Sequence, residues 1–297
     1  MILRDKPGLG DLLFAMQGSV FPIILPRLIG LSAIAAGIVA VDRFVLELPH
    51  PATAPFAVFG IALSLFLGFR NDAAYGRWRD GRRLWGQIIA DMRALGRDCE
   101  VFIQDQELRH RVLRLALAFV HLHRVNLRKL KDNGQARDWC GRDFSDAPHP
   151  PDAALNALAT ELATAARDGR LDGFGQKALT ERLASIGLAQ AGCERIATTP
   201  LPYVYSLLIF RTTYLYCLLL PLALLEPAGW MTTVFVAVVA YVFFGLAEVT
   251  EELAHPFGET VNGLALDAMC RTMEIGAAQH LGITPPEPCK PKDYYLS

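Results

Sequence analysis

The feature that most constrains the fold is an apolar stretch that turns abruptly basic, from Phe56 to Arg83. Its first half, Phe56 to Phe69, contains no ionisable side chain. Its second half carries an excess of arginine: Arg70, Arg77, Arg79, Arg82 and Arg83 against Asp72 and Asp80. Membrane helices are apolar, and their cytoplasmic flanks are rich in Lys and Arg. The stretch therefore predicts a membrane helix that leaves the bilayer on its cytoplasmic side.

Three further stretches are apolar and long enough to cross a bilayer, at residues 19–41, 198–225 and 230–246. Composition agrees, because 52% of the residues are hydrophobic and only 20% are charged. Arg27 lies early in the first stretch, where its side chain can snorkel to the inner face. The sequence thus predicts an all-α integral membrane protein with four transmembrane helices per subunit.

The segment 78–197 has no span, and its apolar residues recur at helical spacing, which predicts a helical cytoplasmic region. Lys and Arg concentrate at the N-terminal flank and after the second span, whereas the two short hairpin loops carry only Arg43. We therefore expect both termini to be cytoplasmic, in a multi-pass protein of a bacterial inner membrane. The expected domains are an N-terminal segment with two spans, the helical region, two more spans, and a C-terminal helix and tail: 1–77, 78–197, 198–252 and 253–297.

Several classes of function lack support in the sequence. No phosphate-binding loop, nucleophile elbow, zinc-protease or dinucleotide motif occurs, so we expect no catalytic residue, no cofactor and no enzyme activity. The six cysteines are scattered without a C-x-x-C pair, so we expect reduced thiols and no metal site. A net charge of −1 argues against nucleic acid as a partner.

Two stripes on the second span fit a helical period equally well: Ile61, Leu65 and Phe69, or Ala62, Phe66 and Phe69. Such a stripe faces lipid or another helix by default. Three small residues nearby permit helices to approach closely: Gly60, Ser64 and Gly68. An apolar lining is compatible with conduction, because a hydrophobic constriction gates by losing and regaining water.

Ionisable residues also lie in or near the last two spans. Arg211 is well inside the third span, and Glu248 and Glu251 end the fourth. If these spans are antiparallel neighbours, Arg211 and the glutamates come close together. The alternatives are a salt bridge that joins two helices and a direct contact with a permeating ion.

Three segments together resemble the bestrophins, most closely their bacterial branch. They are GFRNDAAYGRWRDGRRLWG (68–86), AGCERIATTPLPYVYSLLIFRTTYLYC (191–217) and HPFGETVNGLALDAMCRT (255–272). The similarity extends over nearly the whole chain, with the motifs in the same order and at comparable spacing.

The resemblance implies a homopentameric ion channel surrounded by membrane lipids. It places the apolar pore neck at Ile61, Leu65 and Phe69, because Gly68-Phe69 matches the family's Gly-Phe at the inner end of the neck. It also implies a lower cytoplasmic constriction, formed by one apolar side chain on the helix before the GCER segment. We expect Leu179 there, with Ile186 as the alternative.

The resemblance leaves the activator and the ion open. In animal bestrophins, a run of aspartates that helps to bind calcium follows Asn-Pro-Phe-Gly. Here the segment 259–263 offers a single carboxylate, so we expect no calcium activation through it. Animal members are chloride channels, whereas bacterial members need not share that preference and can favour cations.

The leading hypothesis is therefore an oligomeric channel that conducts monovalent ions through a hydrophobic neck gate. The rival is a membrane-anchored scaffold or sensor whose helical region binds a cytoplasmic partner.

Overall fold

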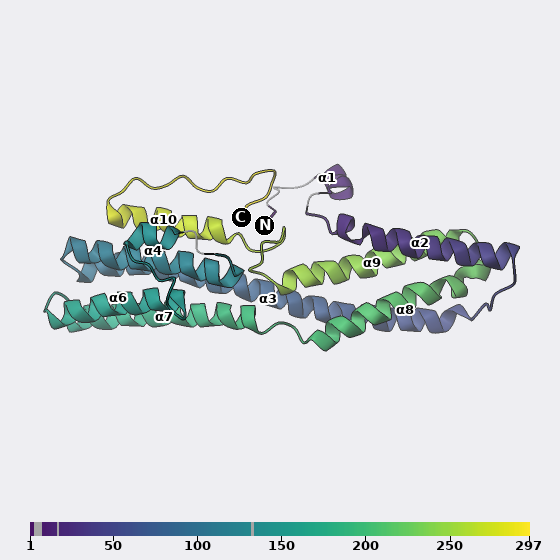
Figure 1. The fold of residues 1–297 in the computed structure, drawn as a ribbon, viewed down its shortest axis with the longest axis horizontal. Coiled ribbons are helices and arrows are strands. Elements are labelled where there is room, and N and C mark those ends of the chain that lie inside the picture. Colours follow the sequence, from purple (N-terminus) through teal and green to yellow (C-terminus); the bar gives the residue numbers. More distant parts are fainter. Residues whose placement is uncertain (3–7, 17, 132–133) are drawn as a thin grey trace. The chain divides into compact units, whose positions relative to one another are not determined.

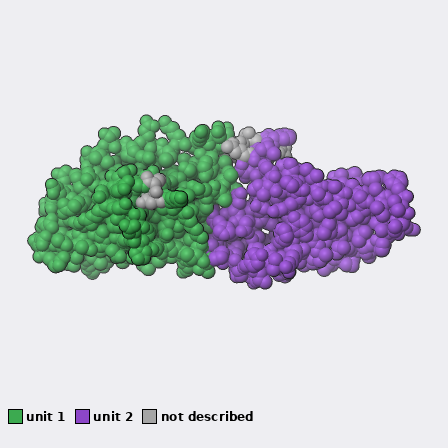
Figure 2. All heavy atoms as spheres, viewed as in Figure 1, with its two compact units in different colours: residues 1–3, 79–199, 256–297 green, residues 4–78, 200–255 purple. Residues whose placement is uncertain are grey.

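The computed structural model describes residues 1–2, 8–16, 18–131 and 134–297. The regular elements within these residues are helices, and the described β-structure is limited to isolated bridges. The chain divides into two compact units (Figures 1 and 2). Unit 2 comprises residues 4–78 and 200–255, and unit 1 comprises residues 1–3, 79–199 and 256–297. The C-terminal segment thus belongs to the same unit as the segment between the second and third spans.

Within the described residues, four helices are long and apolar enough to span a membrane. They are α2 (Phe21–Phe44), α3 (Thr53–Phe102), α8 (Tyr203–Ala228) and α9 (Met231–Ala254). The prediction of four membrane helices is confirmed. The helix α3 continues unbroken through the arginine run, because the sequence from 70 to 102 contains no proline and its four glycines are tolerated in a long helix. The short helix α1 (Leu9–Phe14) precedes them.

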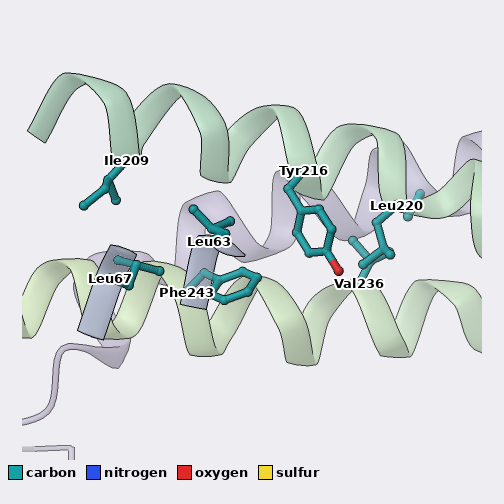
Figure 3. Close-up of a cluster of buried hydrophobic side chains, with 8 residues drawn as sticks. Leu63, Leu67, Ile209, Tyr216, Leu220, Val236 and Phe243 are labelled. Atoms are coloured by element: carbon teal, nitrogen blue, oxygen red, sulfur yellow. The ribbon is translucent and has the colours of Figure 1, made fainter. Parts of the chain in front are cut away.

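The core of unit 2 lies where α3, α8 and α9 meet. Leu63 and Leu67 from α3 point at Ile209, Tyr216 and Phe243 (Figure 3). A Cβ atom on Gly60 would lie only 2.6 Å from the Tyr216 hydroxyl oxygen. Glycine at position 60 therefore permits the close approach of α3 and α8.

A second cluster joins α2 to α8 and α9. Ile24, Leu28 and Leu31 pack against Cys217, Ala240 and Phe244. The helix α2 begins with a proline in its first turn, where the missing N–H costs no hydrogen bond. Together the two clusters bury one face of each membrane helix.

Unit 1 contains the second half of α3 and five further helices: α4 (Gln106–Arg128), α5 (Gln135–Cys140), α6 (Pro150–Arg167), α7 (Gly173–Thr198) and α10 (Leu266–Leu281). The helix α4 packs against α5, α6, α7 and α10. It is consequently buried on most of its circumference, from Val112 to His123.

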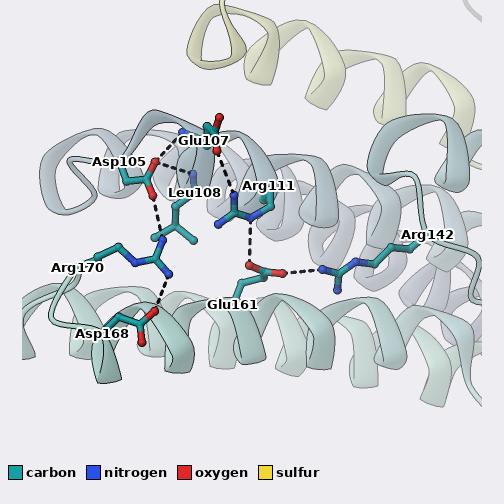
Figure 4. Close-up of polar contacts among 8 residues, drawn as sticks. All are labelled: Asp105, Glu107, Leu108, Arg111, Arg142, Glu161, Asp168 and Arg170. Carbon is teal, nitrogen blue, oxygen red and sulfur yellow. Dashed lines mark hydrogen bonds and ion pairs between the residues drawn. The ribbon is translucent and has the colours of Figure 1, made fainter.

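Ion pairs connect the surface of α4 to α6 and the segments that flank it (Figure 4). Asp105 caps α4 by accepting from the backbone N–H of Leu108, and it also pairs with Arg170 at 3.0 Å. Glu161 of α6 accepts from Arg111 at 3.2 Å and from Arg142 at 2.6 Å. Burial raises the pKa of Glu161, but these two arginines outweigh it and hold the pKa below its usual value.

A buried carboxylate joins α3 to α7. The side chain of Asp91 is 1% exposed and accepts from Arg182 at 2.9 Å and from the Ser185 hydroxyl at 2.7 Å. Arg182 also pairs with Asp98 at 3.2 Å. A buried charge that is paired in this way destabilises the fold strongly when its partner is removed.

We predict that Asp91→Ala lowers the free energy of unfolding by about 2 kcal/mol, because Arg182 and Ser185 lose a buried acceptor. Thermal unfolding of the purified protein in detergent measures the effect. Glu181→Ala is the control, since Glu181 is 70% exposed on α7, next to Arg182, and its pair with Lys177 contributes little. Equal unfolding temperatures for the two variants would contradict the proposed role of Asp91.

Candidate functional site

The candidate neck residues occupy the uncovered side of α3. Ile61 is 71% exposed, Leu65 57% and Phe69 64%. On the opposite side of the same helix, Leu63 and Leu67 are buried in the core of unit 2. With about 100° of rotation per residue, Ile61 and Leu65 point away from that core. One chain therefore leaves this stripe without a covering partner among the residues the structure describes.

Two of the arginines near the inner end of α3, Arg70 and Arg77, face the core rather than the stripe. Arg70 is 9% exposed and donates to Glu251 at 2.7 Å and to the Ser206 hydroxyl at 2.9 Å. Arg77 donates to the carbonyl oxygen of Ala254 at 2.9 Å. These two guanidinium groups thus connect α3 to α8 and α9, and they place no charge on the candidate neck.

The prediction that Arg211 pairs with Glu248 or Glu251 is wrong within one chain. We expected Arg211 to approach Glu248 and Glu251. Glu251 instead pairs with Arg70, and Glu248 pairs with Arg27 of α2 at 3.4 Å. Arg211 is exposed, and no ion pair is found for it within the described ranges. The reason is its helical phase, because the α8 side chains that face the other helices are Ile209, Thr213 and Tyr216.

The expected residues of the lower constriction are also wrong. Leu179 and Ile186 are both 0% exposed, since they form part of the core of unit 1. A side chain without exposed surface cannot line a pathway. The large apolar side chains that α7 does expose are Phe174, at 82%, and Leu188, at 75%.

Two histidines of α4, His121 and His123, belong to the core of unit 1. Their spacing of two residues puts them about 200° apart on a helix, which predicts one packed and one surface side chain, but both are buried. His123 stacks between Trp85 and Phe119, with ring centroids 5.5 and 5.6 Å away. Burial, aided by the charge of His149, lowers the pKa of His123 to about 3. His123 therefore stays neutral at physiological pH, and α4 is buried on two faces rather than one.

Nothing in the described part of the chain forms a metal site or a disulfide. No group of three or more His, Cys, Asp or Glu side chains there has the geometry to hold a metal ion, and the six cysteines are free. Burial raises the pKa of Cys99 and of Cys193 to about 12, which keeps these thiols protonated and unreactive.

Carboxylates of the loop after α9 and of the first turn of α10 lie against arginines. Asp267 accepts from Arg128 at 2.7 Å and from Arg124, and Glu259 lies 3.8 Å from Arg128. Burial raises the pKa of Asp267, but Arg128 and Arg124 outweigh it and lower the pKa overall. Two arginines are unfavourable neighbours for a divalent cation. The absence of calcium activation nevertheless remains a prediction.

Comparison with known proteins gives consistent matches over most of the chain. The family model described as bacterial/fungal bestrophin protein matches residues 1–279. A voltage-dependent anion channel-forming protein of Mesorhizobium japonicum is 42% identical over 301 residues, covering 100% of this chain and 97% of the relative. The voltage-dependent anion channel-forming protein YneE of Escherichia coli K12 is 34% identical, covering 94% and 93%. A crystal structure of a bacterial bestrophin homologue from Klebsiella pneumoniae superposes with a TM-score of 0.84 at 30% identity, covering 88% of this chain and 100% of that one.

We predict that Glu251→Gln destabilises unit 2 by about 1–2 kcal/mol, because it leaves the buried Arg70 without its counter-charge. The loss is limited by the exposure of Glu251, which is 53%. Thermal unfolding in detergent measures it, with the exposed Glu226→Gln as control. The double variant Arg70→Met, Glu251→Leu should recover most of the loss, and a double variant as unstable as the sum of its parts would refute the pairing.

Proposed function

Because this chain belongs to the bestrophin family of bacteria and fungi, we propose that it forms an oligomeric channel for monovalent anions. The observation that carries the proposal is the stripe Ile61, Leu65 and Phe69, which is apolar, exposed and located on a membrane helix. The relatives' names as anion channel-forming proteins support the ion class.

The stripe has the chemistry of a hydrophobic neck. Three rings of Ile61, Leu65 and Phe69 side chains, one from each subunit, would surround a narrow apolar passage. Water leaves such a passage when it is narrow and enters when it widens, so small movements of α3 switch conduction. The pairing of Arg70 and Arg77 within unit 2 supports this role, because it keeps their charges out of the passage.

A single copy of α3 cannot enclose a pathway, whereas copies related by rotation can. We propose the homopentamer that the family resemblance implies. Membrane lipids would cover the remaining exposed apolar surface of α2, α8 and α9. The distribution of Lys and Arg supports a position in the bacterial inner membrane with both termini in the cytoplasm.

We further propose that Phe174 forms the lower constriction, in place of Leu179 and Ile186. It is a large apolar side chain, it is 82% exposed, and it lies in the first turn of α7, where Asp172 caps the helix by accepting from the Gly175 N–H. The cap stabilises the helical turn whose backbone carries this side chain.

One observation favours cations as the rival permeant class. Asp72 is exposed and lies seven residues after Leu65, so it continues the same face of α3. A ring of carboxylates at the inner end of the neck would attract cations and repel anions.

Shortening the side chains of the neck should widen it and allow water to enter more easily. We expect Leu65→Ala and Phe69→Ala to raise open probability severalfold in planar bilayers, and Phe174→Ala to raise single-channel conductance. Ile29→Ala is the control, because Ile29 is comparably exposed on α2 and lies outside the proposed pathway. Unchanged gating in both neck variants would count against the assigned stripe, and unchanged conductance against Phe174.

The sign of the permeant ion is tested by the reversal potential of reconstituted protein across a salt gradient. An anion channel gives a reversal potential near the equilibrium potential of chloride. A reversal potential near the equilibrium potential of the cation would favour cation conduction. Asp72→Asn should shift the reversal potential further toward chloride if Asp72 lines the neck. Absence of any current above that of empty liposomes would instead favour a scaffold or sensor.

A further inference from the structure

A small charged cavity lies among the membrane helices of unit 2. It has a volume of about 160 Å³ and is lined by residues of α2, α3, α8 and α9. Two ion pairs form part of its wall, Arg27 with Glu248 and Arg70 with Glu251. Most of the remaining lining is apolar. Charged side chains are costly within a bundle of membrane helices, and those that occur there commonly mark a functional site.

Two buried donors in this wall have no acceptor. Thr213 is 1% exposed, and its hydroxyl has no hydrogen-bond partner among the described residues. The same is true of the Nε–H of Arg70, whose residue is 9% exposed. Thr212 and Thr250, by contrast, donate to the carbonyl oxygen four residues earlier, at 2.8 and 2.7 Å. Because an unpaired buried donor is costly, Thr213 and Arg70 indicate a ligand or water whose oxygen accepts from them.

The donors and the carboxylates occupy different depths. Thr213 lies seven residues beyond Ser206, or about 10 Å further along α8 from the helix start. Glu248 and Glu251 lie in the last two turns of α9. The cavity also reaches the surface, since Phe210 in its lining is 51% exposed and the side chain of Glu251 is 53% exposed. A ligand that enters from the bilayer can therefore pass Phe210 and extend toward the helix ends.

From this arrangement we propose that the cavity binds the headgroup of a membrane phospholipid that carries both a phosphate and a primary ammonium, as phosphatidylethanolamine does. The phosphate oxygens accept from Thr213 and Arg70, and the ammonium donates to Glu248. In such a lipid the phosphate lies nearer the acyl chains than the ammonium does. This order matches the donors within the bundle and the carboxylates near the helix ends.

The charges of the cavity favour a zwitterion over an anion. Two guanidinium groups and two carboxylates cancel, so the wall complements a headgroup that carries both signs. Glu248 retains capacity for an ammonium, because its contact with Arg27 measures 3.4 Å. Charge-assisted hydrogen bonds of this kind are usually about 2.7–2.9 Å long.

Removal of the Thr213 hydroxyl tests the phosphate contact. The full chain in detergent is titrated with dioctanoyl phosphatidylethanolamine, and its unfolding temperature is measured, since a ligand of the folded state raises that temperature. Thr213→Val should weaken binding about tenfold, because a hydrogen bond to a charged group is lost. Without lipid the variant should be at least as stable as the wild type, since valine removes an unpaired hydroxyl.

Thr212→Val is the matched control, because its hydroxyl bonds to its own helix and it does not line the cavity. This variant should bind the lipid as the wild type does. Equal affinities for Thr213→Val and Thr212→Val would overturn the assignment of the phosphate.

A second lipid tests the ammonium contact. Dioctanoyl phosphatidylglycerol has the phosphate without an ammonium, and the wild type should bind it severalfold more weakly than dioctanoyl phosphatidylethanolamine. Glu248→Gln should remove most of that difference, since the neutral amide attracts an ammonium less strongly. Equal binding of the two lipids by the wild type, or a preference that persists in Glu248→Gln, would overturn the assignment of the ammonium.

Free phosphoethanolamine distinguishes a lipid from a soluble zwitterion. At the same concentration it should leave the unfolding temperature unchanged, because it lacks the acyl chains that hold the headgroup at the bundle. A shift as large as that caused by the lipid would refute the lipid assignment. If no probe shifts the unfolding temperature, the cavity holds only water and the proposal is wrong. These outcomes do not depend on conduction, because the binding is measured without ion flux.

Discussion

The structure depends on the one-sided burial of α3. Leu63 and Leu67 hold this helix in the core of unit 2, whereas the neck stripe, Ile61, Leu65 and Phe69, stays exposed within the described chain. In a bilayer, lipid can cover such a stripe, or copies of the same helix can pack around it. The proposed pore follows from the exposed stripe and from the symmetry of a ring.

The charges at the inner end of the membrane helices also hold these helices together within unit 2. Arg27, Arg70 and Arg77 come from α2 and α3, and each is engaged by α9 through Glu248, Glu251 or a backbone carbonyl. Paired in this way, they tie the helix ends together inside unit 2. On the part of α3 that belongs to unit 2, Asp72 is exposed on the same face as the neck stripe. In the proposed assembly, the ionic preference therefore depends on the balance between a ring of these carboxylates and the potential of the whole assembly.

The sequence predicted which segments form helices better than it predicted which side of each helix is buried. Hydropathy and the arginine run were enough for four membrane helices and for the continuity of α3 beyond Phe69, because both depend on local composition. In a uniformly apolar helix, the local sequence does not determine which side of the helix faces its neighbours. For that reason Arg211 was expected to pair with Glu248 or Glu251, although the pairing arginines come from other helices. The family resemblance pointed to Leu179 as an apolar side chain on the helix before the GCER segment, whereas its burial depends on packing against helices far away in the sequence. Exposure of Phe174 in the first turn of α7 became evident only in three dimensions.

The central claim is that one face of α3 lines a water-accessible throat. It is tested most directly by placing single cysteines along α3 and applying a charged thiol reagent while current is recorded. The account predicts that cysteines at 61, 65 and 69 change the current on modification, whereas cysteines at 63 and 67 do not react. Modification that affects both sets equally, or that alters current only at 63 and 67, would contradict it.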